Sequence, residues 1–411
     1  MKQLYNIAIY AAGFILNTLA LFNKKIKLGV EGRSQTFKIL EEQIANNHLT
    51  FWFHCASLGE YEQGLPIFKQ LRAEHPQHKI VLTFFSPSGY EIRKNTEIAD
   101  VVVYLPMDTK SNAKRFIKLV NPELTIFVKY EIWPNYLNEL KRRGLRAILI
   151  SAVFRKDQTY FQFYGGMMQD ALRTFEHIFV QDENSKLLLN TSHFDNVTVA
   201  GDTRYDRVSD QLLQDNKLSF IEDFVDGKLC IVAGSSWPED EALLIPYINS
   251  MTSDSVKFII APHNIKSNQI VHLTNKLNKK TVLFSEKDNK DLSEFQIFIV
   301  DTIGLLSKVY SYADIAYVGG AMGNTGLHNI LEPAVFGLPI IIGKNYKKFP
   351  EAFQMIAHGG VKSISDKQEL QDSLDRLLDN PKERKTIGNL NSSFINKNKG
   401  AVVQIMNYIR K

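Results

Sequence analysis

The sequence predicts an α/β protein made of two doubly wound halves that face a central cleft. Short runs rich in β-branched residues alternate with helical stretches from residue 51 onward, and the same alternation starts again near residue 229. Such alternation is typical of parallel sheets with helices on both faces. The length of 411 residues also suits two domains rather than one.

In the first half, apolar runs of strand length alternate with helical patterns. The predicted strands are Phe51–Phe53, Ile80–Phe84, Val101–Tyr104, Leu124–Val128, Ala147–Ile150, His177–Val180 and Val197–Ala200. The predicted helices between them include Tyr61–Arg72, Ser88–Asn95, Asn112–Val120 and Pro134–Arg143.

Residues 207–227 are polar and irregular, which indicates a passage between domains. Beyond it, strands are predicted at Leu229–Ala233, Lys257–Ile260, Ile297–Val300, Ile315–Val318 and Pro339–Ile342, and helices at Glu239–Ile248, Lys266–Leu277, Leu305–Tyr312, Gln368–Leu378 and Ala401–Arg410. The predicted domains are therefore 25–206 and 207–411, after an N-terminal segment of residues 1–24.

The composition excludes several classes of protein. Hydrophobic residues make up 44% and charged residues 23%, which indicates a globular chain. The net charge of +5 is too small to predict nucleic-acid binding, and we expect no such partner. Basic clusters at Lys24–Lys27 and Lys141–Arg146 suit either an anionic membrane surface or a solvated helix face. Two distant cysteines without metal spacing fit a reducing compartment.

The N-terminal segment contains an uncharged, mostly apolar run, Tyr5–Phe22, flanked by lysines. At 18 residues the run is at the short end for crossing a bilayer, and the lysines would place the bulk of the chain in the cytoplasm. The sequence therefore predicts an N-terminal membrane anchor. The alternative is a hydrophobic helix that packs on the globular body or lies in the membrane interface.

The stretch Ile315–Gly343 is predicted to fold as strand, glycine loop, helix, turn and strand. Gly320, Gly323 and Gly326 let a ligand or another backbone come close. A glycine loop that leads into a helix near His328 can bind an anion with free N–H groups, and Glu332 in that helix could accept ribose hydroxyls. The alternative is a βαβ unit whose glycines serve packing alone.

Polar groups also follow the strands of the first half. Glu60, after the first strand, could act as a general base on an acceptor hydroxyl. The spacing Ser57-x-x-Glu60 is equally that of a helix capping box. Lys129 and Glu131 follow the fourth strand, as cleft groups or as a surface pair of little energetic value. Arg204 follows the last strand and could bind a carboxylate or phosphate, or lie in solvent.

In the second half, several loops lie at the same sheet edge as the glycine stretch: Gly234–Glu241, Pro262-His263 and Asp301–Gly304. Several such loops at one edge predict a nucleotide-linked ligand. No cluster has metal-ligand spacing and no Walker-type phosphate loop occurs in the sequence, so we expect no metal site.

Five motifs, in order, resemble those of the 3-deoxy-D-manno-octulosonic-acid (Kdo) transferases of lipid A assembly. The family carries H-x-x-S-x-G-E, E-x-E-[LI]-W-P, G-x-x-K-[FY]-D, D-T-x-G-E-L and a V-G-G-S segment that leads to G-G-H-N-x-L-E-P-A. The matching stretches here are His54–Glu60, Glu131–Pro134, Gly201–Asp206, Asp301–Gly304 and Val318–Ala334.

The resemblance implies a glycosyltransferase of the GT-B architecture, anchored at the cytoplasmic face of the inner membrane, whose anionic surface is a partner. The donor would be CMP-Kdo, a substrate rather than a cofactor, and the acceptor a lipid A precursor, with inversion and no required metal. Glu60 matches the general base, and Lys129 and Arg204 match positions that stabilise the transition state. The matching CMP-binding positions are Pro262, His263, Ile303, Gly304, Leu305, Gly320, Asn329, Ile330, Leu331 and Glu332.

The chain departs from the family at several of these positions. Lys129 stands where many members have glutamate, which inverts a charge, and Glu131 could take over its role. Arg204 replaces lysine and keeps the charge but not the geometry. On the donor side, His263 replaces arginine, Leu305 replaces glutamate and Trp237 replaces histidine. We expect a divergent branch with the same reaction.

Two other functions remain open from sequence. A sugar-nucleotide epimerase can share the two-half fold, although it needs no membrane acceptor. A nucleotide-binding envelope protein without activity would bind CMP and turn nothing over.

Overall fold

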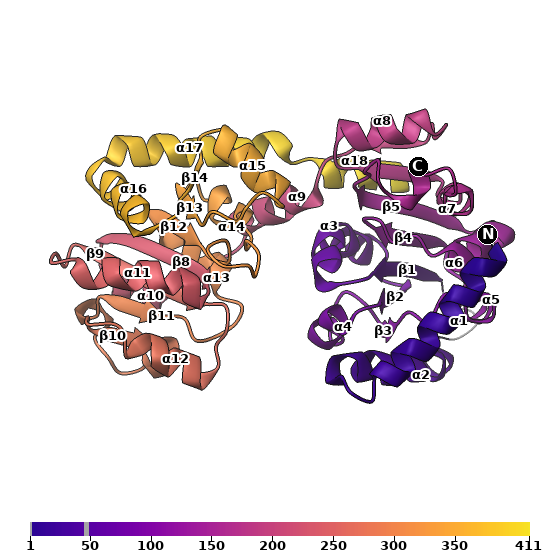
Figure 1. Ribbon diagram of the computed structural model, residues 1–411, viewed down its shortest axis with the longest axis horizontal. Coiled ribbons are helices and arrows are strands. Elements are labelled where there is room, and N and C mark those ends of the chain that lie inside the picture. The colour runs from indigo at the N-terminus through magenta and orange to yellow at the C-terminus, as the bar shows by residue number, and fades with distance from the viewer. Residues whose placement is uncertain (1, 45–48) are drawn as a thin grey trace. The chain divides into compact units, whose positions relative to one another are not determined.

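The computed structural model describes residues 2–44 and 49–411, which form two α/β units (Figure 1). Unit 1 comprises Met1–Arg207 together with Lys399–Lys411, and unit 2 comprises Val208–Asn398. The last thirteen residues, 399–411, thus lie in unit 1, whereas the sequence placed them with the second half.

Unit 1 contains a seven-stranded parallel sheet in the order β3-β2-β1-β4-β5-β6-β7. The chain order reverses beside β1, which gives the sheet its doubly wound topology. Its strands are β1 (Thr50–Cys55), β2 (Lys79–Phe84), β3 (Val101–Tyr104), β4 (Leu124–Val128), β5 (Arg146–Ala152), β6 (His177–Val180) and β7 (Val197–Val199). The seven strands predicted for the first half are all present.

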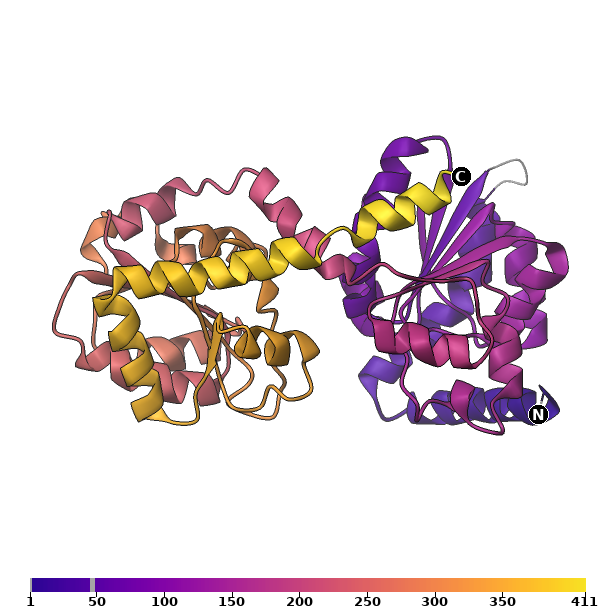
Figure 2. The ribbon, with the colours of Figure 1, turned by 90° about the horizontal axis from the view of Figure 1, so that it is seen from above.

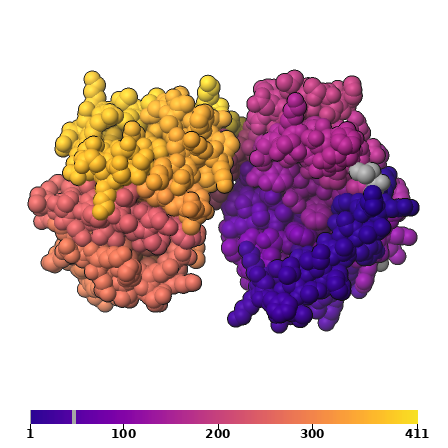
Figure 3. All heavy atoms as spheres, viewed as in Figure 1, coloured from indigo at the N-terminus to yellow at the C-terminus, as the bar shows by residue number. Residues whose placement is uncertain are grey.

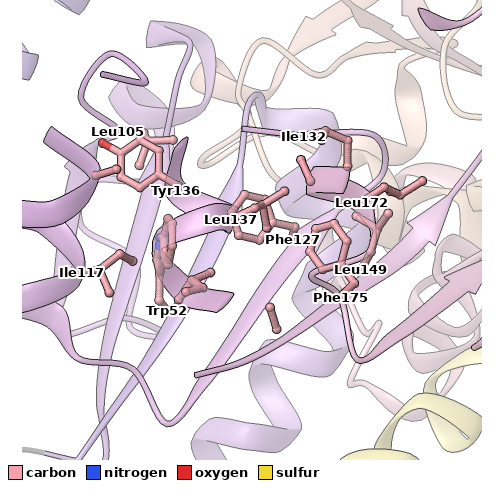
Figure 4. Packing of buried hydrophobic residues seen from close by; sticks show 14 of the residues in the cluster. Trp52, Leu105, Ile117, Phe127, Ile132, Tyr136, Leu137, Leu149, Leu172 and Phe175 are labelled. Carbon is pink, nitrogen blue, oxygen red and sulfur yellow. The ribbon is translucent and has the colours of Figure 1, made fainter. Parts of the chain in front are cut away.

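Strand β1 shows how the sheet is buried on both faces. Trp52 points to a cluster that includes Ile117 and Tyr136 of the covering helices (Figure 4). Phe53 points to the other face, where its ring stacks on Phe68 at 4.2 Å between centroids. Successive residues of β1 point to opposite faces of the sheet, and helices cover both faces. Every position of β1 is therefore buried, and no side chain of the strand faces solvent.

Helices cover both faces of this sheet. One face carries α2 (Lys24–Gln43), α5 (Lys110–Val120) and α6 (Pro134–Arg143), and the other carries α3 (Leu58–Glu74) and the C-terminal α18 (Ala401–Ile409), which Figure 2 shows beside the unit 1 sheet. The remaining helices of unit 1 are α1 (Lys2–Leu19), α4 (Pro87–Arg93), α7 (Gly166–Leu172), α8 (Glu183–Thr191) and α9 (Thr203–Asp210).

Helix α1 lies along the outside of unit 1 (Figure 3). The Tyr5 hydroxyl donates to Asp108 Oδ2 at 2.7 Å, and the Asn135 side chain donates to Asn6 Oδ1 at 3.0 Å. Within residues 2–44 and 49–411, no helix combines the length and apolarity needed to cross a membrane. The predicted anchor helix is therefore not found: α1 ends at Leu19 after 18 residues and is tied by polar side chains to the body of unit 1.

Unit 2 contains a second parallel sheet of seven strands, in the order β10-β11-β9-β8-β12-β13-β14. Its strands are β8 (Leu229–Ser236), β9 (Val256–Pro262), β10 (Thr281–Leu283), β11 (Ile297–Ile299), β12 (Ile315–Val318), β13 (Ile340–Ile342) and β14 (Val361–Ser363). Its helices are α10 (Ser219–Val225), α11 (Pro238–Ser250), α12 (Ser267–Thr274), α13 (Leu306–Val309), α14 (Leu331–Val335), α15 (Pro350–Ala357), α16 (Lys367–Asp379) and α17 (Pro381–Asn398).

Three features of unit 2 differ from the sequence-based expectation. The edge strands β10 and β14 were not predicted, because Thr281–Leu283 and Val361–Ser363 lack a continuous apolar run such as Ile340–Ile342. The passage predicted at 207–227 contains the end of α9 and all of α10. The helix expected near His328 begins only at Leu331, because the preceding loop folds back and the His328 N–H donates to the Gly319 carbonyl.

Candidate active site

Glu60 lies in the first turn of α3, directly after β1, and its side chain is 6% exposed. Its Oε2 accepts the backbone N–H groups of Ala56 and Ser57, the latter at 3.1 Å. The capping interpretation is therefore correct for this oxygen. Among the described residues, no group donates a hydrogen bond to Oε1, so this second oxygen remains available to take a proton.

The surroundings of Glu60 favour its protonated form. Burial raises the pKa of Glu60 to about 7, and the nearby Glu131 carboxylate adds to this effect. The two backbone N–H bonds and the positive charge of Lys129 act in the opposite direction and lower the pKa, but they do not outweigh burial. A carboxyl group that titrates near neutrality has the proton affinity expected of a general base at physiological pH.

Glu131 and Lys129 follow β4, which pairs directly with β1. Glu131 Oε2 accepts the indole N–H of Trp133 at 2.9 Å and lies 3.6 Å from Nε2 of the buried His54. Lys129 adopts a left-handed conformation with φ +72°, which is uncommon for a residue with a side chain, and its ammonium lies 5.2 Å from the Tyr130 ring centroid. The structure thus brings Glu60, Glu131 and Lys129 into one charged group.

Arg204 is held by Asp202. Its Nε donates to Asp202 Oδ2 at 2.8 Å, and the terminal nitrogen lies 2.7 Å from the same oxygen. The helix that carries Arg204 is tied to α3, because the hydroxyl of Thr203 donates to the carbonyl of Gln63. Arg204 is therefore not a solvated turn arginine, and its side chain is 30% exposed.

In unit 2, three aromatic side chains meet beyond β8, β9 and β12. The rings of Trp237 and His263 stack at 4.4 Å, and those of His263 and His328 lie 4.5 Å apart. The indole N–H of Trp237 donates to His328 Nε2 at 3.0 Å, so the imidazole proton sits on Nδ1. Burial, with a contribution from His263, lowers the pKa of His328 to about 4, which keeps this ring neutral.

The glycine loop is fastened by Asp240, a residue that the sequence did not single out. Asp240 is fully buried and accepts the Tyr317 hydroxyl and the N–H of Gly320, both at 2.8 Å. The Gly320 N–H is thus occupied by a side chain of unit 2 and is not free for a phosphate. Gly320 itself is required, because φ is +94° and an added Cβ would come within 2.0 Å of the Gly326 carbonyl oxygen.

The other predicted donor positions fall into two groups. Ile330 and Leu331 are buried, so only their backbone could face a ligand, and Leu331 N–H donates to Asn329 Oδ1. The Asn329 amide also donates to Glu332 Oε1 at 3.0 Å, which orients that carboxylate. The remaining positions form the ends of β9 and the loop before α13: Pro262, the 85% exposed Ile303, Gly304 with φ +95°, and Leu305.

Sequence reasoning did not select His54, Trp237, Asp240 or His328 as site residues. His54 and His328 stand inside motifs that the sequence matched, so their positions carried a signal. Asp240 stands where a helix cap is expected, and only the fold shows that it also binds the glycine loop. Among the described residues, no group of three or more histidine, cysteine or acidic side chains could hold a metal ion.

Comparison with known proteins adds the family context. Residues 31–207 match the family model described as 3-deoxy-D-manno-octulosonic-acid transferase. The chain is 29% identical to the 3-deoxy-D-manno-octulosonic acid transferase of Haemophilus influenzae, over 87% of this chain and 86% of the relative. It is 28% identical to the enzyme of the same name from Aquifex aeolicus, over 84% and 90% of the two chains.

Solved structures show the same fold. The chain superposes on the UDP-GlcNAc 2-epimerase of Neisseria meningitidis with a TM-score of 0.61 and 14% identity, covering 89% of this chain and all of the other. It superposes on Acinetobacter baumannii MurG with a TM-score of 0.54 and 12% identity, covering 88% and 99%. Two parallel-sheet α/β domains that resemble GT-B glycosyltransferases are thereby confirmed.

The resemblance to the Kdo transferases is likewise confirmed, by the family model and by relatives at 24–29% identity over most of the chain. These relatives are named for an enzymatic activity, and Kdo transferases are glycosyltransferases. The predicted enzyme class is therefore confirmed.

Proposed function

Starting from this resemblance, we propose that the protein transfers Kdo from CMP-Kdo to a lipid A precursor. The observation that carries the proposal is the position of Glu60. The motif that resembles the general-base motif of the family lies at the carboxyl end of β1, and its glutamate is buried beside a second carboxylate with one oxygen uncommitted.

The proposed chemistry is a single displacement with inversion. Glu60 Oε1 takes the proton of an acceptor hydroxyl while that oxygen forms a bond to the anomeric carbon of Kdo. The bond between this carbon and the phosphate oxygen breaks at the same time, and its electron pair leaves with CMP. We assign no step to a metal or cofactor, and expect activity to survive dialysis against a chelator.

Charge moves during this displacement from the hydroxyl toward the departing phosphate. Lys129 follows β4 and Arg204 follows β7, and preorganised cations stabilise developing negative charge. Two nitrogens of Arg204 already contact one oxygen of Asp202, so the guanidinium group is held in place by a carboxylate. Glu131 acts on Glu60 through its negative charge, which favours proton uptake.

We propose that unit 2 binds the CMP group. The stacked rings of Trp237 and His263 offer a flat aromatic surface, and the Asn329–Glu332 pair offers a carboxylate for ribose hydroxyls. Because Gly320 N–H is bonded to Asp240, the phosphate must find other donors. The Nδ1–H of His328, whose Nε2 is occupied by Trp237, is one such group.

We propose that the chain works at the cytoplasmic face of the inner membrane through α1 lying on an anionic surface. The outer side of α1 and the following turn expose large apolar residues, among them Leu4, Ile7, Phe14, Leu21 and Phe22. The exposed lysines Lys24 and Lys25 follow directly. Flotation with vesicles containing anionic lipid tests this, and equal binding of a Phe14→Ser/Phe22→Ser variant would contradict it.

The experiment that tests the function follows radiolabel from CMP-Kdo into a lipid A precursor, in detergent, with purified protein. We expect labelled lipid and one CMP released for each Kdo transferred. Conversion of a UDP-sugar to its epimer without lipid would instead establish the epimerase alternative. CMP binding without transfer would establish a nucleotide-binding protein without activity.

A further inference from the structure

His54 is a fully buried histidine beside the charged group of unit 1, and one of its two ring nitrogens has no hydrogen-bond partner among the described residues. It lies on β1 with 0% exposure, among the rings of Phe127 and Trp133. Its Nδ1 is 2.8 Å from the Thr83 hydroxyl oxygen. Its Nε2 is buried and makes no hydrogen bond to any described residue.

The Thr83 hydroxyl accepts the indole N–H of Trp52 at 2.8 Å. Its single proton goes either to His54 Nδ1 at 2.8 Å or to the Phe53 carbonyl at 3.3 Å. In the first case Nδ1 is an acceptor and the imidazole proton lies on Nε2. In the second case Nδ1–H donates to the remaining lone pair of the hydroxyl, so the contact with Thr83 accommodates either tautomer.

The group that Nε2 faces selects between the two tautomers. Glu131 Oε2 lies 3.6 Å from Nε2, and the Glu131 side chain is 15% exposed. A bare Nε2 lone pair opposite a carboxylate oxygen would be repulsive, and the buried nitrogen would be left unsatisfied at a cost in stability. A protonated Nε2 needs only a shift of a few tenths of an ångström to donate to Glu131.

We propose that His54 is a positioning residue that acts through Glu131: the Glu131 carboxylate selects the tautomer with the proton on Nε2, Nδ1 accepts from Thr83, and Nε2–H holds Glu131 beside Glu60. The Trp133 indole N–H binds the same Glu131 oxygen, so two fixed donors orient this carboxylate. The inference rests on the proposed function, since Glu131 acts in transfer only if Glu60 is the base.

Two substitutions at position 54 separate the two contacts. His54→Asn keeps a polar atom near the place of Nδ1 but has nothing at the place of Nε2. His54→Gln carries an N–H near the place of Nε2 and so can reach Glu131. We expect kcat/KM for Kdo transfer to fall about tenfold or more in His54→Asn and to stay within about threefold of wild type in His54→Gln.

A double-mutant cycle tests whether His54 acts through Glu131. In a Glu131→Gln background, which is itself slower, we expect His54→Asn to change kcat/KM by less than about twofold. A full, additive loss in that background would overturn the proposal, and so would equal losses in His54→Asn and His54→Gln.

A measurement that needs no activity reads the tautomer directly. Histidine-selective ¹⁵N NMR of the wild-type chain, with His54→Gln for assignment, should show His54 protonated at Nε2, and Glu131→Gln should shift this resonance. A bare Nε2 would overturn the proposal even if the variants fail to fold. If the wild type transfers no Kdo, the proposed function fails, and the NMR result still decides the His54–Glu131 contact.

Discussion

At the scale of single residues, Glu60 has a geometry that fits both interpretations that the sequence left open. Its Oε2 caps α3, and Oε1 accepts no hydrogen bond from the described residues, so the base chemistry that we propose would use a different atom from the cap. Similarly, Arg204 is bound by its neighbour Asp202 instead of lying free in solvent. The polar groups of unit 1 are thus held in place before any substrate arrives, as electrostatic preorganisation requires.

The raised pKa of Glu60 predicts a stability that depends on pH. An unfolded glutamate titrates near 4.5 and the folded one near 7, so the unfolded state binds fewer protons between these values. The free energy of unfolding therefore falls as pH rises from about 4.5 to 7, by about 3 kcal/mol, and the loss persists above pH 7. Below pH 4.5 the carboxyl group is protonated in both states and contributes nothing.

Glu60→Gln removes the cost of burying a charged carboxylate above pH 7. In thermal melts of both proteins, we expect the Tm of the variant minus the Tm of wild type to be more positive at pH 8.5 than at pH 5.5. Glu97→Gln, at an exposed residue of the same unit, is the control and should show no such trend. If the Tm difference between Glu60→Gln and wild type does not depend on pH, the raised pKa of the buried Glu60 carboxyl group is contradicted.

At the scale of elements, the glycine loop after β12 depends on the start of α11. Asp240 accepts the N–H of Trp237 at 2.9 Å, which caps α11, and also the N–H of Gly320 and the Tyr317 hydroxyl. Asp240→Asn removes the negative charge that receives these three donors and leaves one oxygen where the carboxylate has two, so we expect a loss of about 1–3 kcal/mol in the free energy of unfolding. Hydrogen exchange should also increase in residues 319–323.

The control for this prediction is Asp366→Asn. Asp366 caps α16 at an exposed position, where its side chain accepts the Glu369 N–H at 3.0 Å. We expect a cost below about 1 kcal/mol there, because asparagine is also a good cap. Equal costs at the two positions would show that Asp240 is an ordinary helix cap and does not hold the glycine loop.

At the scale of the whole molecule, the C-terminal helix belongs to unit 1 although it follows the last helix of unit 2. Asp206 accepts the N–H groups of Gly400 and Ala401, and Ile405 and Met406 are fully buried in the unit 1 core. We expect Ile405→Ala to cost about 2–5 kcal/mol and to speed hydrogen exchange in unit 1 but not in unit 2. Val403→Ala, on the exposed side of the same helix, should cost far less.

Faster exchange in unit 2 alone after Ile405→Ala would contradict the assignment of the tail. The sequence predicted a helix at Ala401–Arg410 but not its partner, because an amphipathic pattern shows that one side is buried and not which sheet buries it.

Other parts of the fold could be predicted from the sequence wherever the burial pattern left a clear apolar pattern. Long apolar runs such as Ile80–Phe84 and Leu124–Val128 predicted central strands, since strands covered on both faces show continuous apolar sequence. The edge strands β10 and β14 were missed, because Thr281–Leu283 directly follows two lysines and Val361–Ser363 has a single apolar residue. The apolar run at Tyr5–Phe22 predicted a membrane anchor, whereas α1 is bound to unit 1 through Tyr5 and Asn6.

The sequence predicted those residues of the candidate site that lie in motifs after the strands, but not the contacts between distant segments. Glu60, Lys129 and Glu131 fall together because β1 and β4 are neighbours in the sheet, which the doubly wound order implies. The roles of His54 and Asp240 depend on contacts to Thr83, Glu131, Tyr317 and Gly320, between segments far apart in the chain. No local pattern records such contacts.

The most direct test of the account is the rate of Kdo transfer by Glu60→Gln, measured with CMP binding on the same preparation. If Glu60 takes the proton of the acceptor hydroxyl, the variant binds CMP with unchanged affinity and loses turnover by about 10²-fold or more. Turnover equal to that of wild type, at unchanged CMP affinity, would show that another group is the base.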